Sequence, residues 1–325
     1  MIKKDLFAPE GMYLWDSWFL MQGETCHAMF LQAPRDGNPE GRHHNKVSIG
    51  HATSTDLVHW TYNGTVLQPG ETGSWDDLSL WTGDLFKEKG KYYLFYTGRS
   101  TQEFWTQRIG LAVSEDLKSF EKLPEPVLET HVKDYELFEE PNELGFCSAW
   151  RDPNVLFDKK SQLYYMSYSA RVQTGSPVPA TYNACIGLAS SKDLMNWRVE
   201  KPLFAPGEFD QMECPQLFHF NGYYYLFFSS WERCNHPDRK GQRASGLFGY
   251  CSKELRGPWE PVNEDGLILG NGEQIYDIRF VSYQSSKFLA LGWINVDQSG
   301  EFIGRLSHPI PFEIDGKNVI PSYFN

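Results

Sequence analysis

The sequence predicts an all-β protein folded as a five-bladed β-propeller, and three observations support this prediction. A Gly followed closely by a Ser and then an aromatic residue recurs five times, a strand-like run precedes each copy, and helix-period windows are scarce in a chain with 15% aromatic residues. The repeated glycines are Gly50, Gly110, Gly187, Gly249 and Gly304, spaced by 60, 77, 62 and 55 residues. This spacing is too long for a helical solenoid and indicates repeated sheets.

Each repeat contains the same succession of four expected strands. The inner strands are expected at 16–21, 83–88, 152–157, 214–219 and 277–283, and the second strands at 26–32, 91–98, 163–170, 223–230 and 287–294. The second strands alternate apolar with polar or aromatic residues, which is typical of a half-buried strand. A third strand carries the Gly and the Ser, and a fourth begins at the aromatic residue. Four antiparallel strands form one propeller blade, whereas the alternative is an ordinary sandwich.

The length of 325 residues fits one propeller, since propellers of this size are single domains. We therefore expect a single catalytic domain over residues 1–325, with no internal boundary. Turn signals such as Asn63-Gly64 and Asn221-Gly222 punctuate the blocks.

The composition excludes several classes of partner. The net charge is −12 and no basic stripe is present, which argues against a nucleic-acid partner. No apolar stretch reaches the roughly 18 residues of a membrane span. The first residues, MIKKDLFAPE, lack the apolar core of a secretory signal, and six cysteines are then interpreted as reduced thiols. We expect a cytoplasmic protein, and the oligomeric state is not predicted.

Acidic residues recur near the starts of the inner strands, which converge at one end of a propeller's channel. Counting about nine residues back from each turn places Asp16, Trp81, Asp152, Glu213 and Asp277 at one shared position. Four carboxylates would then surround one pocket, an arrangement usually retained for chemistry. Tryptophans flank Asp16 and Asp152, and aromatic faces suit the apolar side of a sugar ring.

Two carboxyl groups across a glycosidic bond are the equipment of a glycosidase, since one protonates the leaving oxygen and the other attacks or activates water. Arg151 can keep Asp152 ionised and donate hydrogen bonds to vicinal hydroxyls. For each acidic residue the competing interpretation is a turn or capping role. His43 and His44 lie in a polar stretch without a third ligand, so no metal site is predicted.

Several motifs resemble those of clan J glycoside hydrolases, the invertase and fructanase family 32 and the levansucrase family 68. ECPQLF at Glu213 resembles the family 32 acid/base motif, and WRDPNV around Asp152 resembles the RDP motif of the clan. LWDSWF around Asp16 resembles the family 68 nucleophile motif, and SLWTGD is similar to a Trp-Ser-Gly-Ser segment with Thr82 for Ser. Gln32 in MFLQAP resembles a family 32 Gln. The mixture leaves membership between the two families open.

The resemblance implies a retaining hydrolase of β-fructofuranosides, of the sucrose, fructo-oligosaccharide or fructan type, with transfer to other sugars as a further outcome. Asp16 would be the nucleophile, Glu213 the acid/base and Asp152 the residue that supports the transition state. The implied substrate-binding residues are Trp15, Gln32, Trp81, Thr82, Arg151, Cys214 and Asp277. No metal or organic cofactor is implied, and the partner is a small-molecule or oligosaccharide substrate. The family 32 C-terminal β-sandwich is expected to be absent, because the sequence ends soon after PIPFEIDGKNVIPS.

Two alternatives stay open. One is an inverting arabinanase or xylosidase with the same fold, which a carboxyl separation of about 6.5–9.5 Å would indicate, against about 5–5.5 Å for retention. The other is a carbohydrate-binding propeller without catalysis. Within the first reading, the basic stretch from Arg233 to Arg243 is a candidate grip for a sugar phosphate.

Overall fold

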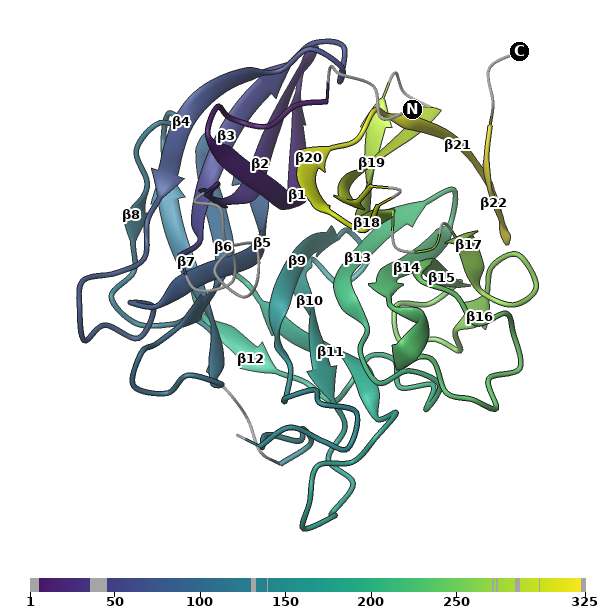
Figure 1. The fold of residues 1–325 in the computed structure, drawn as a ribbon. Helices are drawn as coiled ribbons and strands as arrows, with labels where there is room; N and C mark the ends of the chain where they lie inside the picture. The colour runs from purple at the N-terminus through teal and green to yellow at the C-terminus, as the bar shows by residue number, and fades with distance from the viewer. Residues whose placement is uncertain are drawn as a thin grey trace.

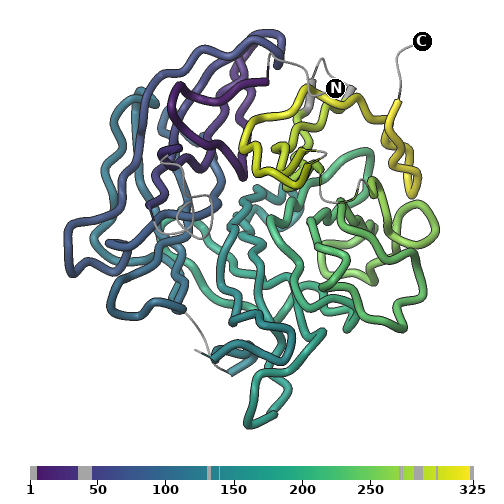
Figure 2. Tube along the Cα trace, in the orientation of Figure 1, coloured from purple at the N-terminus to yellow at the C-terminus, as the bar shows by residue number. Residues whose placement is uncertain are grey.

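Five antiparallel sheets are arranged around a central axis in the computed structural model (Figures 1 and 2). The structure describes residues 6–35, 46–129, 133–138, 140–270, 272, 274–283, 287–297 and 299–322. The five-bladed propeller predicted from the repeats is confirmed, and each blade is built from consecutive strands. Within the described residues, no helix has the length and apolar character needed to cross a membrane.

The blades follow one another in chain order. Blade one contains β1 (Met12–Gln22), β2 (Thr25–Pro34), β3 (Ser48–Ser54) and β4 (Thr61–Leu67). Blade two contains β5 (Ser79–Glu88), β6 (Lys91–Arg99), β7 (Gln107–Ser114) and β8 (Glu121–Lys122). Blade three contains β9 (Trp150–Asp158), β10 (Leu163–Arg171), β11 (Ala184–Ser191) and β12 (Trp197–Val199). Blade four contains β13 (Glu213–Phe220), β14 (Tyr223–Ser230), β15 (Gly246–Ser252), β16 (Glu260–Pro261) and β17 (Leu267–Gly270). Blade five contains β18 (Ile275–Tyr283), β19 (Lys287–Val296), β20 (Phe302–Leu306), β21 (Ile310–Asp315) and β22 (Asn318–Pro321).

The repeated Gly of the third strand is required by an aromatic ring on the second strand. The cross-strand pairs are Gly50–Phe30, Gly110–Tyr96, Gly187–Tyr168 and Gly249–Phe227. A Cβ added at any of these glycines would lie 2.2 to 2.5 Å from an atom of the paired ring. Only Gly leaves room for the ring to lie across the strand, which explains why the motif recurs.

The Ser that follows the Gly makes the turn that ends the third strand. Ser54 Oγ accepts the N–H of Leu57 at 2.8 Å, and Leu57 adopts a φ of 62°. Ser114 and Leu117 repeat this contact at 3.0 Å in blade two. The Ser-x-Asp-Leu segment therefore forms a turn that is capped by the Ser side chain.

Blade five departs from the repeat. Two short strands, β20 and β21, both pair with β19 where one third strand was expected from Ile303. Pro309 and Pro311 lie in this stretch, and a proline has no N–H to donate to the ladder. The third strand is therefore split in two.

Polar side chains on the inner strands connect one blade to the next. Equivalent residues in blades two, three and four accept a backbone N–H from the following inner strand: Asp84 from Val155 at 2.7 Å, Asn154 from Leu217 at 2.8 Å and Gln216 from Phe280 at 2.9 Å. These bonds fix the height of each blade relative to its neighbour.

Blades one and five meet at a seam formed by separate sheets (Figure 1). The Leu306 N–H donates to Phe7 O at 2.8 Å, and Arg35 Nη2 donates to the carbonyl oxygens of Ile303 and Gly304 at 2.6 and 3.1 Å. Ser17 N–H donates to Asp277 Oδ2 at 3.0 Å across the same boundary. Side chains and single hydrogen bonds therefore close the ring.

Candidate active site

Every inner strand carries one extra residue near its start, where two residues oppose one on the second strand. These bulges follow Trp15, Trp81, Arg151, Glu213 and Tyr276. Each of these five residues pairs directly with the second strand, and the next residue in each strand begins the bulge: Asp16, Thr82, Asp152, Cys214 and Asp277. Two successive layers of side chains thus surround the end of the channel. The five residues that pair with the second strand form one layer, and the five residues that begin the bulges form the other.

This register corrects the sequence-based alignment by one residue in two blades. Asp16, Asp152 and Asp277 are equivalent as expected, but their counterparts are Thr82 and Cys214 rather than Trp81 and Glu213. Glu213 instead shares its position with Arg151 and Tyr276. The error arose because the count ran back across the hairpin turns, whose lengths differ: two residues separate β5 from β6 and β13 from β14, but four separate β9 from β10.

The bulges explain how consecutive residues reach one cavity. Along a regular strand, neighbouring side chains point to opposite faces. Here Trp15 and Asp16, Trp81 and Thr82, Arg151 and Asp152, and Glu213 and Cys214 all line the same cavity of about 410 Å³. Asp16, Asp152, Cys214 and Asp277 adopt positive φ values of 20°, 59°, 53° and 44°. Such strained backbone in non-glycine residues is typical of functional sites.

Two predicted substrate-binding residues lie outside this cavity. Gln32 is buried in blade one, where its amide donates to Thr65 Oγ1 at 2.7 Å and accepts from the Tyr62 hydroxyl at 3.2 Å. Asp277 is fully buried beneath the cavity lining. Neither side chain therefore lines the cavity, and the substrate-binding roles of Gln32 and Asp277 stay predictions.

Asp16 is held by one neighbour on each side. Thr82 Oγ1 donates to its Oδ2, and Trp293 Nε1 donates to its Oδ1 at 2.9 Å. Burial, reinforced by the negative charge of Asp277, raises the pKa of Asp16 well above its ordinary value, while the Thr82 bond opposes the shift. Both donors fix the direction of the carboxylate and stabilise its charged form.

Glu213 is held between a cation and a phenol. Arg151 Nη2 donates to Oε1 at 2.8 Å, and the Tyr276 hydroxyl donates to Oε2 at 2.5 Å. Trp231 stacks on Tyr276 with ring centroids 3.8 Å apart, which fixes the phenol. With 21% of its side chain exposed, Glu213 is more accessible than Asp152, whose side chain is 3% exposed.

Asp152 lies deeper and accepts several donors. Ser169 Oγ donates to its Oδ2 at 2.9 Å, the Cys214 N–H donates to the same oxygen at 3.1 Å, and Arg151 Nε lies 3.4 Å away. Burial raises the pKa of Asp152, and the Arg151 charge opposes this rise. One guanidinium thus serves both Asp152 and Glu213.

Sequence reasoning missed several residues that line the cavity, among them Tyr276, Trp293, Gln211, Trp231 and Phe146. Tyr276 could have been found, because it precedes Asp277 by one residue, just as Arg151 precedes Asp152. Trp293 pairs with Tyr276 on the next strand, so the same register identifies it. The other three lie in connections between strands, and no repeat signal marks them.

Among the described residues, one group of potential metal ligands occurs, formed by Asp16, Cys214 and Asp277 with ligand atoms within 4.8 Å of one another. Asp277 already pairs with Arg279 Nε at 2.6 Å, and Asp16 accepts two donors. Both carboxylates therefore already have partners within the protein, which favours a hydrogen-bonded arrangement over a cation site. His43 and His44 lie outside the described residues.

The four basic residues of the stretch from Arg233 to Arg243 have different surroundings. Arg239 is buried against Phe209 and Phe248 and donates to the carbonyl oxygen of Gln242 at 2.6 Å, while Arg233 lines the cavity. Lys240 and Arg243 are exposed and do not line it. Of these four basic residues, Arg233 alone lines the cavity, and the phosphate site stays a prediction.

Comparison with known proteins identifies relatives across most of the chain. The model of the glycosyl hydrolases family 32 N-terminal domain matches residues 7–308. A levansucrase from Erwinia amylovora is 27% identical over 70% of this chain, and the match spans 60% of that protein's length. An extracellular sucrase from Zymomonas mobilis is 25% identical over 94% of this chain and 84% of its own.

Solved structures share the same fold. An inulosucrase from Halalkalicoccus jeotgali bound to kestose superimposes with a TM-score of 0.82 at 24% identity, over 97% of this chain and 89% of the other. A Bacillus subtilis levansucrase variant in complex with oligosaccharides gives a TM-score of 0.79 at 19% identity, over 99% and 88% of the two chains. Both support the five-bladed architecture.

The expectation of a cytoplasmic protein was wrong. A relative that matches 94% of this chain is an extracellular sucrase of Zymomonas mobilis, and this relationship indicates an extracellular location. The six cysteines are indeed free, but five of them are buried. Burial raises the pKa of thiols such as Cys26 and suppresses their reactivity, so their reduced state carries little information about the compartment. The family match extends over nearly all of the propeller, and the chain therefore belongs to the glycosyl hydrolases family 32 N-terminal domain family.

Proposed function

We propose that this protein is a retaining glycoside hydrolase that acts on β-fructofuranosides, with sucrose as its first substrate, and that transfers the fructosyl unit to sugars as well as to water. The observation that carries the proposal is the convergence of Asp16, Asp152 and Glu213 from three inner strands on one cavity, with Arg151 bridging two of them. The names of the sucrase and levansucrase relatives support the choice of sucrose.

In the first step, ionised Asp16 attacks the anomeric carbon of the fructosyl unit while Glu213 gives its proton to the departing oxygen. The bond from that carbon to the leaving oxygen breaks, and an ester to Asp16 forms. Thr82 and Trp293 hold Asp16 in place for this attack. The Glu213 carboxylate that remains is oriented by Arg151 and Tyr276.

In the second step, Glu213 takes a proton from water or from a sugar hydroxyl, whose oxygen attacks the same carbon and releases Asp16. Positive charge develops on the fructosyl ring in both steps. Asp152 lies close to Arg151 and accepts bonds from Ser169 and Cys214, so its charge is fixed in position to stabilise that ring. Hydrolysis and transfer then differ only in the acceptor.

Incubation with sucrose in the presence of methanol tests this function. A retaining mechanism yields methyl β-fructofuranoside, which proton NMR identifies, alongside glucose and fructose. Asp16→Asn should abolish turnover, whereas Asp193→Asn, on the exposed turn after β11, should keep full activity. Formation of the α-anomer, or cleavage of an arabinoside but of no fructoside, would overturn the proposal.

A further inference from the structure

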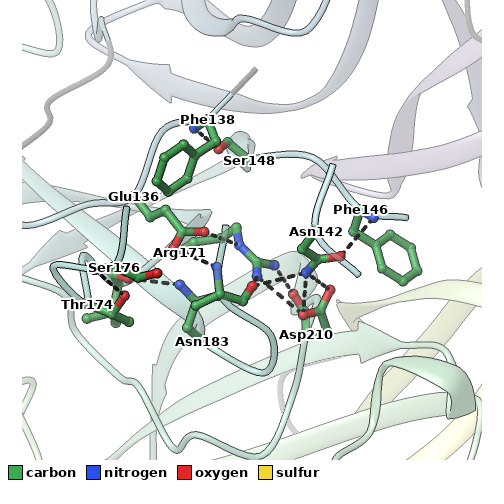
Figure 3. A network of polar contacts seen from close by, with 12 residues as sticks. Glu136, Phe138, Asn142, Phe146, Ser148, Arg171, Thr174, Ser176, Asn183 and Asp210 are labelled. Carbon is green, nitrogen blue, oxygen red and sulfur yellow. Dashed lines mark hydrogen bonds and ion pairs between the residues drawn. The ribbon is translucent and has the colours of Figure 1, made fainter. Parts of the chain in front are cut away.

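A buried ion cluster lies at the end of strand β10 (Figure 3). Arg171, at the end of β10, is only 1% exposed, and it lies between Glu136 at 1% and Asp210 at 0%. Arg171 Nε donates to Glu136 Oε1 at 3.0 Å, and its Nη2 donates to Asp210 Oδ1 at 3.2 Å. Arg171 Nη1 donates to the Asp210 carbonyl oxygen at 2.6 Å. Desolvated charges of this kind persist only where each has its partner.

The cluster joins three connections that are distant in sequence. Glu136 belongs to the connection before β9, Asp210 precedes β13, and Ala180 lies between β10 and β11. The Ala180 N–H donates to Glu136 Oε2 at 3.2 Å, and the Tyr182 N–H donates to Asp210 Oδ1 at 2.9 Å. The cluster therefore fixes these segments relative to one another, although no sheet holds them.

Asn142 connects this cluster to the cavity. Its Nδ2 donates to both Asp210 oxygens at 2.9 and 3.1 Å, while its Oδ1 accepts the N–H groups of Leu144 and Phe146 at 3.0 and 3.1 Å (Figure 3). One side chain thus anchors and shapes the turn at 142–148. Gly145, Phe146, Cys147 and Ser148 of this turn line the cavity.

The position of the turn indicates which part of a substrate it meets. The reacting sugar must lie against Asp16, in the layer of bulge residues. Residues 142–148 come just before β9, which begins at Trp150 and carries Arg151 and Asp152, and Gly145 to Ser148 line the cavity together with these two residues. We infer from this order that the turn extends the cavity wall beyond the two layers. The group that departs from or attacks the fructosyl unit approaches from that side.

We propose that Asn142, anchored by the Arg171 cluster, is a positioning residue that holds 142–148 as the wall of the leaving-group and acceptor subsite. This inference rests on the proposed function. An ordered wall excludes water and offers a sugar a fixed surface, so it favours transfer to a sugar over hydrolysis. The carbohydrate class that the wall receives is the glucosyl unit of sucrose or the end of a fructo-oligosaccharide.

Asn142→Ser tests the anchor while keeping one oxygen for the turn. We expect the ratio of hydrolysis to transfer at high sucrose to rise about threefold, with KM increased and kcat for hydrolysis within about twofold of the wild type. Cys147 gives an independent readout, because it lies in the turn and is the one cysteine of six that is not buried. Its labelling by a maleimide should become about tenfold faster as the turn loosens.

Asn263→Ala serves as the matched control. The Asn263 amide also joins separate segments, donating to Leu267 O at 3.2 Å and Val319 O at 2.6 Å, and it does not line the cavity. It should lower stability without changing the product ratio or the labelling of Cys147. If Asn142→Ser does not fold, Phe146→Ala, which leaves the cluster intact, should raise the same ratio.

The outcomes are distinguishable. A folded Asn142→Ser protein with wild-type labelling and product ratio overturns the inference, as does faster labelling with an unchanged ratio. If Asn142→Ser does not fold, an unchanged ratio in Phe146→Ala overturns it instead. Failure of the wild type to cleave any fructoside removes the proposed function, whereas the labelling rates still report whether Asn142 orders the turn.

Discussion

Replacing Asp84 with Asn should remove the contribution of this carboxyl group to the pH dependence of stability. Asp84 begins the series of bonds between inner strands, accepting from Val155 N–H at 2.7 Å, Leu85 N–H at 3.0 Å and Asn154 Nδ2 at 3.1 Å. Burial nevertheless dominates and raises the pKa of Asp84 from 3.8 to about 6. The carboxylate is therefore costly to ionise in the folded protein.

The magnitude follows from that shift. A difference of about 2 pK units corresponds to roughly 3 kcal/mol, at about 1.4 kcal/mol per unit. Because the folded chain binds this proton more tightly than the unfolded chain, stability is greatest below about pH 4 and falls as the pH rises to about 6. Above that value the loss is complete and constant. Asn does not titrate, so its variant lacks this term.

Urea unfolding followed by tryptophan fluorescence between pH 4 and pH 8 measures the effect. The free energy of unfolding of Asp84→Asn, relative to the wild type, should rise by roughly 3 kcal/mol across this range. Gln216→Ala is the control, since Gln216 holds the equivalent position in blade four and does not titrate. The difference in free energy of unfolding between Gln216→Ala and the wild type should be the same at every pH. A difference for Asp84→Asn that stays constant within about 0.5 kcal/mol would refute the reasoning.

Three further predictions concern the repeat and the site. Gly187→Ala should lower the free energy of unfolding by about 1–3 kcal/mol, because its Cβ would lie 2.2 Å from the Tyr168 ring. In a double-mutant cycle, Tyr168→Leu should relieve this loss, and additive effects of the two substitutions would contradict the explanation. Asp16→Asn should raise the melting temperature, and the rise should be larger at pH 8 than at pH 5. Burial raises the pKa of Asp16, so its charged form is costly in the folded protein, and Asn removes that cost. A lower melting temperature at both pH values would count against this explanation. Tyr276→Phe should reduce kcat/KM by about 10- to 100-fold through loss of the hydrogen bond to Glu213, and steady-state kinetics showing an unchanged value would exclude that role.

The blades could be predicted because their determinants are local. The Gly of each third strand, its aromatic partner and the Ser-capped turn all lie within one sheet, so their letters recur at fixed offsets. Blade five was less regular because Pro309 and Pro311 interrupt its ladder. These are properties of short stretches of sequence.

The site was only partly predictable, because its register was counted back across hairpin turns that differ in length from blade to blade. Asp16, Asp152 and Glu213 were found through their motifs, yet Glu213 was placed in the wrong layer. Gln32 resembles a family residue and is nevertheless buried in its blade. The turn at 142–148 depends on Arg171 and on Asp210, which lies 68 residues after Asn142, and on no repeat.

The seam between the first and last blades makes the catalytic centre dependent on closure of the ring. Asp16 belongs to blade one, whereas the Trp293 and Asp277 that contact its surroundings belong to blade five. A molecule that had built every sheet but not joined its two ends would show a full β-sheet circular dichroism signal and no turnover. Catalytic competence therefore depends on closure of the ring, and mild denaturants that separate the first and last blades should abolish activity before they unfold the sheets.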